Sequence, residues 1–196
     1  MIGLWVVVGI VVLIALYVWL SYNRLVPLRN LYLNGYADID VQLKRRYDLI
    51  PNLVEAVKGY MGHERGTLEA VTAARGAAVS AAGHAAAAPG DPQAMQSLSR
   101  AESELGGALG RLLAVVESYP ELKANQNVMS LQGELTNTEN EIATARQVYN
   151  LEVMQYNNGR ESFPAVLFSG RLGFRQAALL ESIESPAERK PPKVQF

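Results

Sequence analysis

The chain contains 196 residues, of which 49% are hydrophobic, and its formal net charge is −1. A chain of this length can form one domain with its own core plus an appendage, and a net charge near zero provides no positive field for a nucleic-acid partner. It contains no cysteine, which excludes disulfides, thiolate nucleophiles and cysteine-ligated zinc or iron–sulfur sites.

The amino-terminal run MIGLWVVVGIVVLIALYVWL, residues 1–20, carries no charged side chain. About 20 helical residues at 1.5 Å each match the roughly 30 Å hydrocarbon core of a bilayer. A cleaved signal peptide is the alternative, but it requires basic residues before the apolar run and a site of small residues after it. The sequence has neither and therefore predicts a single transmembrane helix over residues 1–22.

The end of this run and the residues just after it contain side chains typical of a membrane–water interface. Trp19 and Tyr22 suit an aromatic belt, and Arg24 and Arg29 lie just beyond it. Since no basic side chain precedes the run, the positive-inside rule places the rest of the chain in the cytoplasm. Two arginines are a small bias, so the periplasmic side stays open as an alternative.

From residue 23 to residue 162, apolar side chains follow a heptad period, and no sustained stretch has a period of two. The predicted fold is all-α, an antiparallel four-helix bundle with long first and fourth helices. Pro27 and Pro51 are expected to kink the first helix without ending it. Its two coiled-coil-like seams contain Tyr36, Leu43, Ile50 and Val57, and Ile39, Arg46, Leu53 and Tyr60.

Three further helices are predicted over about residues 64–86, 92–119 and 127–161. The second is rich in alanine, which favours helix but buries little area, so it either packs closely on a neighbour or lies exposed. Asp91 and Pro92 suit the N-cap and first position of the third helix. The fourth helix has the strictest pattern, with apolar residues at spacing seven: Val128, Leu135, Ile142, Tyr149 and Tyr156.

The segment 163–180 combines aromatic and cationic side chains and contains no acidic residue. An even number of helical passes returns the chain to the bilayer at this segment, where rings and arginines suit an anionic interface. The alternative is a cap folded over the open end of the bundle. Residues 181–196 are polar and proline-rich, and we expect them to be disordered. The candidate interface residues are Phe163, Phe168, Arg171, Phe174 and Arg175.

Five stretches, in this order, resemble the LemA family of membrane-anchored bacterial proteins: YNRLVPLRN, DIDVQLKRRYDLIPNLVEAVKGYMGHERGTLEAVTAAR, ESYPELKAN, LQGELTNTENEIATARQVYN and YNNGRESFPAVLFSGRLGF. Together they cover most of residues 22–174, and the departures lie in the alanine-rich region 76–94 and after Phe174. The resemblance implies a membrane helix that carries a soluble helical bundle in the bacterial cell membrane. It implies no established catalytic activity.

No catalytic or cofactor-binding motif is complete in the sequence. HERGT, residues 63–67, begins as a zincin motif does, but Thr67 stands where the second histidine is required. Three glutamates cluster on the fourth helix, but the Glu-x-x-His repeats of a di-metal bundle are missing. We therefore expect no catalytic residue, no metal and no cofactor.

The cationic run at residues 44–46 is interpreted as structural. Lys44 is four residues from both Asp40 and Asp48, a spacing typical of surface ion pairs. Only Arg46 falls on the apolar seam, where a guanidinium needs a carboxylate. We predict a structural ion pair between Arg46 and a glutamate of the fourth helix: Glu134, Glu139 or Glu141.

Two functions fit these features, and an enzyme is a third alternative. The first is a membrane-tethered scaffold or adaptor of the cell envelope with no catalytic activity, whose bundle binds another envelope protein. The second is a membrane-organising protein that assembles into homo-oligomers at the bilayer. The expected partners are the lipid bilayer and an envelope protein or further copies of the chain, and not nucleic acid.

Overall fold

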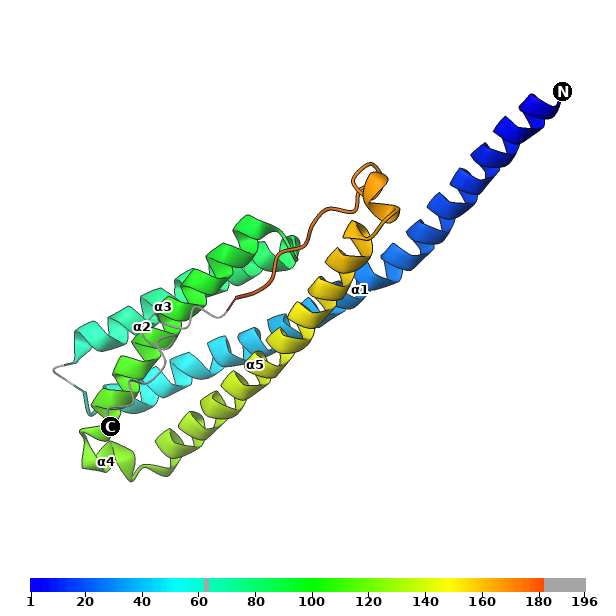
Figure 1. Cartoon of the computed structure of the whole chain (residues 1–196). Coiled ribbons are helices and arrows are strands. Elements are labelled where there is room, and N and C mark those ends of the chain that lie inside the picture. Colours follow the sequence, from blue (N-terminus) through cyan, green and yellow to red (C-terminus); the bar gives the residue numbers. More distant parts are fainter. Residues whose placement is uncertain (62–63, 182–196) are drawn as a thin grey trace, which may run out of the picture.

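The computed structural model describes residues 1–61 and 64–181, and every regular element within them is a helix. His63 of the sequence motif HERGT and residues 182–196 of the expected disordered tail lie outside the described residues. Figure 1 shows long helices side by side, with one helical arm leaving the body at its amino-terminal end. The elements are α1 (Ile2–Lys58), α2 (Arg65–Ala87), α3 (Pro92–Glu117), α4 (Pro120–Lys123), α5 (Gln126–Glu161) and the 3₁₀ helix η1 (Ala165–Leu167).

The arm and the first body helix are one continuous helix, α1, which contains both Pro27 and Pro51. The arm, residues 2–20, is exposed along almost its whole length. It is the one helical segment among the described residues long and apolar enough to cross a membrane. Burial begins at Ser21 and Leu25 and continues to the end of the helix.

The core is built mainly where α5 lies along α1 (Figure 1). The predicted seam of α5 is buried at all five heptad positions, as is the first predicted seam of α1. Two glycines let these helices approach closely. A Cβ at Gly35 would meet the Glu152 carboxylate and lie 3.3 Å from the Tyr149 Cα, and one at Gly159 would lie 3.0 Å from a Leu28 methyl group.

The alanine-rich helix α2 packs on α3 and also contacts α1. Its small side chains leave the backbone accessible to α1, so the Tyr47 hydroxyl oxygen lies 3.3 Å from the Ala78 carbonyl oxygen. Asp91 caps α3 as expected, accepting from the backbone N–H groups of Gln93 and Ala94. Of the two alternatives for the alanine-rich helix, close packing on a neighbour is therefore the one that the structure shows.

Two boundaries differ from the sequence prediction. Tyr60 is exposed although it falls on the second predicted seam of α1, because the helix ends at Lys58 and the heptad register ends with it. The chain between the predicted third and fourth helices also forms the extra turn α4, in which Pro120 occupies the first helical position. Proline suits this position because its missing N–H would have no intrahelical partner there.

After α5 the chain forms a loop around η1, and residues 174–181 then run without regular secondary structure back over α5 and α3. We call residues 174–181 the strap. Two asparagines of α5 each bind one strap residue through both backbone groups: Asn157 binds Ala177 at 2.8 and 3.1 Å, and Asn150 binds Leu180 at 2.9 and 3.1 Å. On the α3 side, the Ala178 N–H donates to the Gly90 carbonyl at 2.8 Å. Helix side chains therefore satisfy a backbone that has no strand partner.

Candidate functional site

The loop after α5 lies against the arm of α1. The ring of Phe168 meets that of Tyr17 edge to face, with centroids 6.1 Å apart. Tyr17 belongs to the apolar run predicted to cross the membrane, five residues before Tyr22. The segment 163–168 therefore lies beside the end of the arm, where Figure 1 shows the arm leaving the body.

Phe174 differs from the expectation that it faces lipid. It is 1% exposed, because its ring packs edge to face on Tyr22 at 5.5 Å and is covered by the Arg29 guanidinium at 5.5 Å. The Arg29 side chain is thereby engaged in a cation–π contact rather than extended into solvent. Beyond Phe174 the chain continues as the strap, so the cap alternative describes this part of the segment.

The other predicted interface residues are accessible or partly accessible. Trp19, Arg24, Phe163, Arg171 and Arg175 are exposed, and Tyr22 retains an exposed edge. Two apolar side chains that the sequence reasoning did not single out, Val166 and Leu167, are also exposed beside Phe163. In the segment 163–180, the exposed apolar side chains named here lie at residues 163–167, and both arginines are also exposed.

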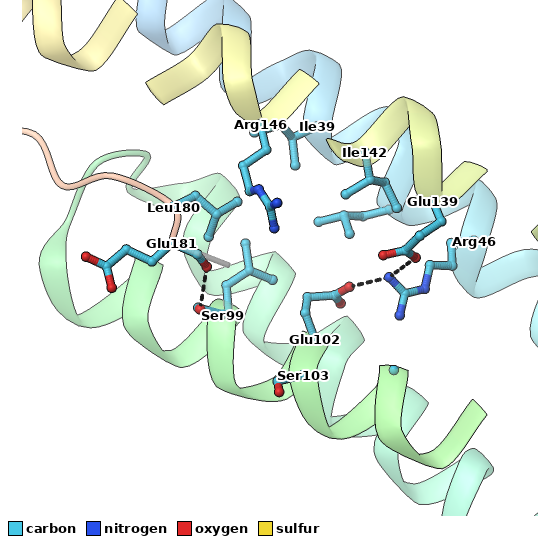
Figure 2. A pocket seen from close by; sticks show the side chains of 13 residues that line it. Ile39, Arg46, Ser99, Glu102, Ser103, Glu139, Ile142, Arg146, Leu180 and Glu181 are labelled. Carbon is cyan, nitrogen blue, oxygen red and sulfur yellow. Dashed lines mark hydrogen bonds and ion pairs between the residues drawn. The ribbon is translucent and has the colours of Figure 1, made fainter. Parts of the chain in front are cut away.

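A second cluster is centred on Arg46, which is 4% exposed. Its Nη1 lies 2.9 Å from a carboxylate oxygen of Glu139 on α5 and 3.1 Å from one of Glu102 on α3 (Figure 2). The structure thus brings Arg46 to Glu139 among the three glutamates named from the sequence, and adds Glu102. Glu134 and Glu141 make no ion pair with Arg46 within the described residues.

Glu102 is the more buried of the two acids, with 17% of its side chain exposed against 62% for Glu139. Burial raises the pKa of the Glu102 carboxyl above its usual range, and the nearby charge of Glu139 adds to this. The Arg46 charge and a 2.5 Å hydrogen bond from the Tyr47 hydroxyl oppose the shift. The same burial raises the pKa of Tyr47, so the phenol stays protonated and donates.

Glu102 was missed by the sequence reasoning, although a signal was present. Its spacing from Leu98 and Leu105 places it on the apolar stripe of α3, as the spacing of Arg46 places the arginine on a seam of α1. Two opposite charges on buried stripes of different helices are candidates for one pair. The period alone does not say which helices face each other.

A pocket of about 250 Å³ lies beside the cluster, between α1, α3, α5 and the end of the strap. Figure 2 shows Arg146 pointing into it from α5, with Leu180 beside the Arg146 side chain and Ser99 across from it on α3. The charges of Arg46 and Arg146 balance those of Glu102 and Glu139, so these four side chains create no net field for a charged ligand. The end of the strap, at Leu180 and Glu181, forms part of the pocket wall.

Within residues 1–61 and 64–181, no three His, Asp or Glu side chains are grouped to hold a metal ion. Glu102 and Glu139 approach each other, but Arg46 occupies the position between them. These carboxylates therefore bind a guanidinium.

Comparison with known protein families identifies the family of this chain. The model of the LemA family matches residues 35–196. The chain belongs to the LemA family. The matched range includes the Arg46 cluster, all of α2 to α5 and the strap, so the family pattern covers the body of this LemA protein from Gly35 of α1 onward.

Three magnetosome proteins are similar to this LemA-family chain. MamQ 1 and MamQ 2 of Paramagnetospirillum magneticum (strain AMB-1) are each 28% identical to it over 187 residues, which cover 88% of this chain and 68% of the relative. MamQ of Magnetospirillum gryphiswaldense (strain MSR-1) is 26% identical over the same length and shares. Together with the exposed apolar arm, this relationship indicates that the LemA-family chain is membrane-associated.

Proposed function

We propose that this protein is a membrane-tethered helical scaffold or adaptor of the bacterial cell envelope, with no catalytic activity of its own. In this proposal the arm crosses the inner membrane once and the body is an antiparallel four-helix bundle that presents its outer surface to an envelope protein. The positive-inside bias of Arg24 and Arg29 favours a cytoplasmic body.

The observation that carries the proposal is the continuity of α1. The helix that leaves the body as the exposed arm is the same helix that forms the seam with α5. An unbroken helix transmits orientation, whereas a flexible linker would let the body rotate freely. A body held at a set angle to the bilayer is suited to present one surface repeatedly to a partner.

In-cell photo-crosslinking tests the adaptor role. A photoreactive amino acid replaces Val41 of α1 or Leu151 of α5, two exposed apolar residues of the body, in the full-length chain. We expect each position to crosslink to the same second protein, identified by mass spectrometry. Leu13 in the exposed arm is the matched control, since it should crosslink to lipid. Crosslinks from the body to lipid alone would contradict the adaptor role.

The alternative, homo-oligomeric assembly at the membrane, is favoured by a specific feature of α5. Val148, Leu151 and Met154 are all exposed, although they are apolar and spaced three residues apart on one helix. Such spacing places them on neighbouring parts of the helix surface, and exposed apolar clusters often mark contacts between proteins.

Light scattering of the full-length chain in detergent distinguishes the two functions. A defined oligomer that becomes a monomer in the Val148→Glu/Leu151→Glu variant supports self-assembly. Glu substitutions at the exposed polar positions Gln147 and Asn158 are the matched control and should leave the mass unchanged. A monomeric wild-type chain across the accessible concentration range rules out the alternative.

A further inference from the structure

We infer that the segment 163–168 is a second membrane contact, in which Phe163, Val166 and Leu167 enter the boundary between head groups and acyl chains of an anionic bilayer. This inference deepens the proposed function and rests on the arm crossing the membrane. We call Phe163, Val166 and Leu167 the apolar tip.

The position of the loop along the arm carries the first step. Phe168 touches Tyr17, and Tyr17 lies five residues before Tyr22, at the end of the predicted span. At 1.5 Å per residue this contact lies about 7.5 Å along the helix toward the bilayer centre from Tyr22. A bilayer that surrounds the arm therefore also reaches the loop. Figure 1 shows the loop at the end of the body from which the arm leaves.

The exposure of the apolar tip carries the second step. Phe163, Val166 and Leu167 are 80%, 47% and 59% exposed, respectively, whereas Phe174 of the same segment is buried. The loop thus turns some of its apolar side chains into the body and leaves the others uncovered beside the arm. Moving a large apolar side chain out of water is favourable, so these uncovered side chains favour contact with an apolar phase. The bilayer around the arm is the apolar surface nearest to these side chains, because the loop lies beside the arm.

The charges around the apolar tip carry the third step. Arg24, Arg171 and Arg175 are exposed, and no acidic residue lies between Ser162 and Leu180. Cations next to a bilayer surface are attracted to anionic head groups. In contrast, the cationic run at residues 44–46 is more than 20 residues from the span, so screening over about 8 Å removes its attraction to the surface.

Two attachments restrict the body more than one does. The unbroken helix fixes the body relative to the arm, but the arm itself can still tilt in the bilayer. A loop seated in the interface beside the arm restricts that tilt. The strap continues directly from this loop and is bound to α3 and α5. The strap therefore links the membrane contact to the wall of the Arg46 pocket, which its residues Leu180 and Glu181 line.

The absence of native cysteine allows a direct test with single labels on the full-length chain in lipid nanodiscs. Phe163→Cys and Leu167→Cys are each labelled with an environment-sensitive fluorophore. Leu13→Cys in the arm and Ser118→Cys, an exposed position at the carboxyl end of α3, are the matched controls. Quenching by lipids that carry a nitroxide on the acyl chain reports contact with the bilayer.

We expect labels at residues 163 and 167 to show blue-shifted emission and quenching close to that at residue 13, with no quenching at residue 118. Quenching at residue 13 but not at residues 163 and 167 would overturn the second contact and leave the tether intact. Loss of quenching at residue 13 as well would show that the proposed function itself fails.

Lipid charge tests the role of the arginines. Quenching at residue 163 should be stronger in nanodiscs that contain phosphatidylglycerol than in pure phosphatidylcholine, and Arg171→Gln/Arg175→Gln should abolish this difference. Arg100→Gln/Arg111→Gln removes two exposed arginines of α3 and should leave the difference unchanged. An equal response to both lipids in the wild-type chain would overturn the attraction to anionic head groups.

Discussion

Arg75 on α2 donates from Nε to the backbone carbonyl oxygen of Tyr47 on α1 at 2.6 Å. In a regular helix this carbonyl would accept from the N–H of residue 51, but Pro51 has none. The proline thus leaves a free acceptor in the last quarter of α1, and a neighbouring helix satisfies it with a charged donor. The neighbouring Asp48 could not satisfy this acceptor, because an ionised carboxylate has no proton to donate to a carbonyl.

A double-mutant cycle tests this compensation. Arg75→Met keeps an aliphatic stem but removes the donor, and leaving the Tyr47 carbonyl unsatisfied should cost about 1–3 kcal/mol of unfolding free energy. In the Pro51→Ala background the helix supplies its own N–H, so the cost of Arg75→Met should fall. Denaturant unfolding of the full-length chain in detergent, followed by circular dichroism, measures both costs. Equal costs in the two backgrounds would contradict the compensation.

The Arg46 cluster predicts an asymmetry between its members. Arg46→Ala leaves Glu102 without its buried cation and should lower the unfolding free energy by about 3–5 kcal/mol. Glu139→Gln, which alters the more exposed acid, should cost less than about 1 kcal/mol. The double variant Arg46→Met/Glu102→Met removes both buried charges and should recover most of the loss. The same unfolding measurement checks these values, and a double variant as unstable as Arg46→Ala would exclude the charge explanation.

Glu102 should make stability depend on pH with a definite sign. Because its folded-state pKa is raised, the folded chain binds this proton more tightly than the unfolded chain does. As pH falls from neutral through the raised pKa toward the ordinary carboxyl pKa, wild type should gain stability relative to Glu102→Gln. Above the raised pKa the difference should be constant. Unfolding of both proteins over a pH series measures it, and a difference that does not change with pH would contradict the raised pKa.

The strap predicts a local effect at two asparagines. Asn157→Ala removes both hydrogen bonds to Ala177 and should raise the amide exchange rate over residues 174–181, at a cost of about 1–3 kcal/mol to closure of the strap. The helical content should not change. Asn158→Ala alters the exposed neighbouring residue and is the matched control. Hydrogen exchange by mass spectrometry reads out the strap, and equal rates in the two variants would show that Asn157 does not hold it.

The close approach of α1 and α5 predicts a difference between two glycines. Gly35→Leu places a side chain against Glu152 and the Tyr149 backbone and should destabilise the chain by about 1–3 kcal/mol. Gly133→Leu, on α5 where nothing lies within 4 Å of a Cβ, should be neutral or stabilising because glycine disfavours helix. Thermal unfolding of the two variants compares them, and a similar loss at both positions would exclude close packing as the cause.

Much of the fold was predictable because it depends on neighbours in the sequence. A heptad period identifies which side of a helix is buried, so Leu135, Ile142 and Tyr149 were assigned to the core before their partners were known. The Asp91 cap is equally local, since the side chain binds backbone groups two and three residues ahead. The same period identified Arg46 as a charge on a buried seam.

Other features were decided only by the tertiary structure, because they depend on how distant segments meet. The heptad period does not define the register between helices, so it could not select Glu139 over Glu134 and Glu141, or bring Glu102 from α3. The segment after α5 has no period at all, and only its contacts divide it into an exposed turn at Phe163 and a buried anchor at Phe174. The sequence by itself determined the helices and their apolar faces, through interactions that are local along the chain. The strap, the partners of Arg46 and the place of the apolar tip beside the arm required packing across helices.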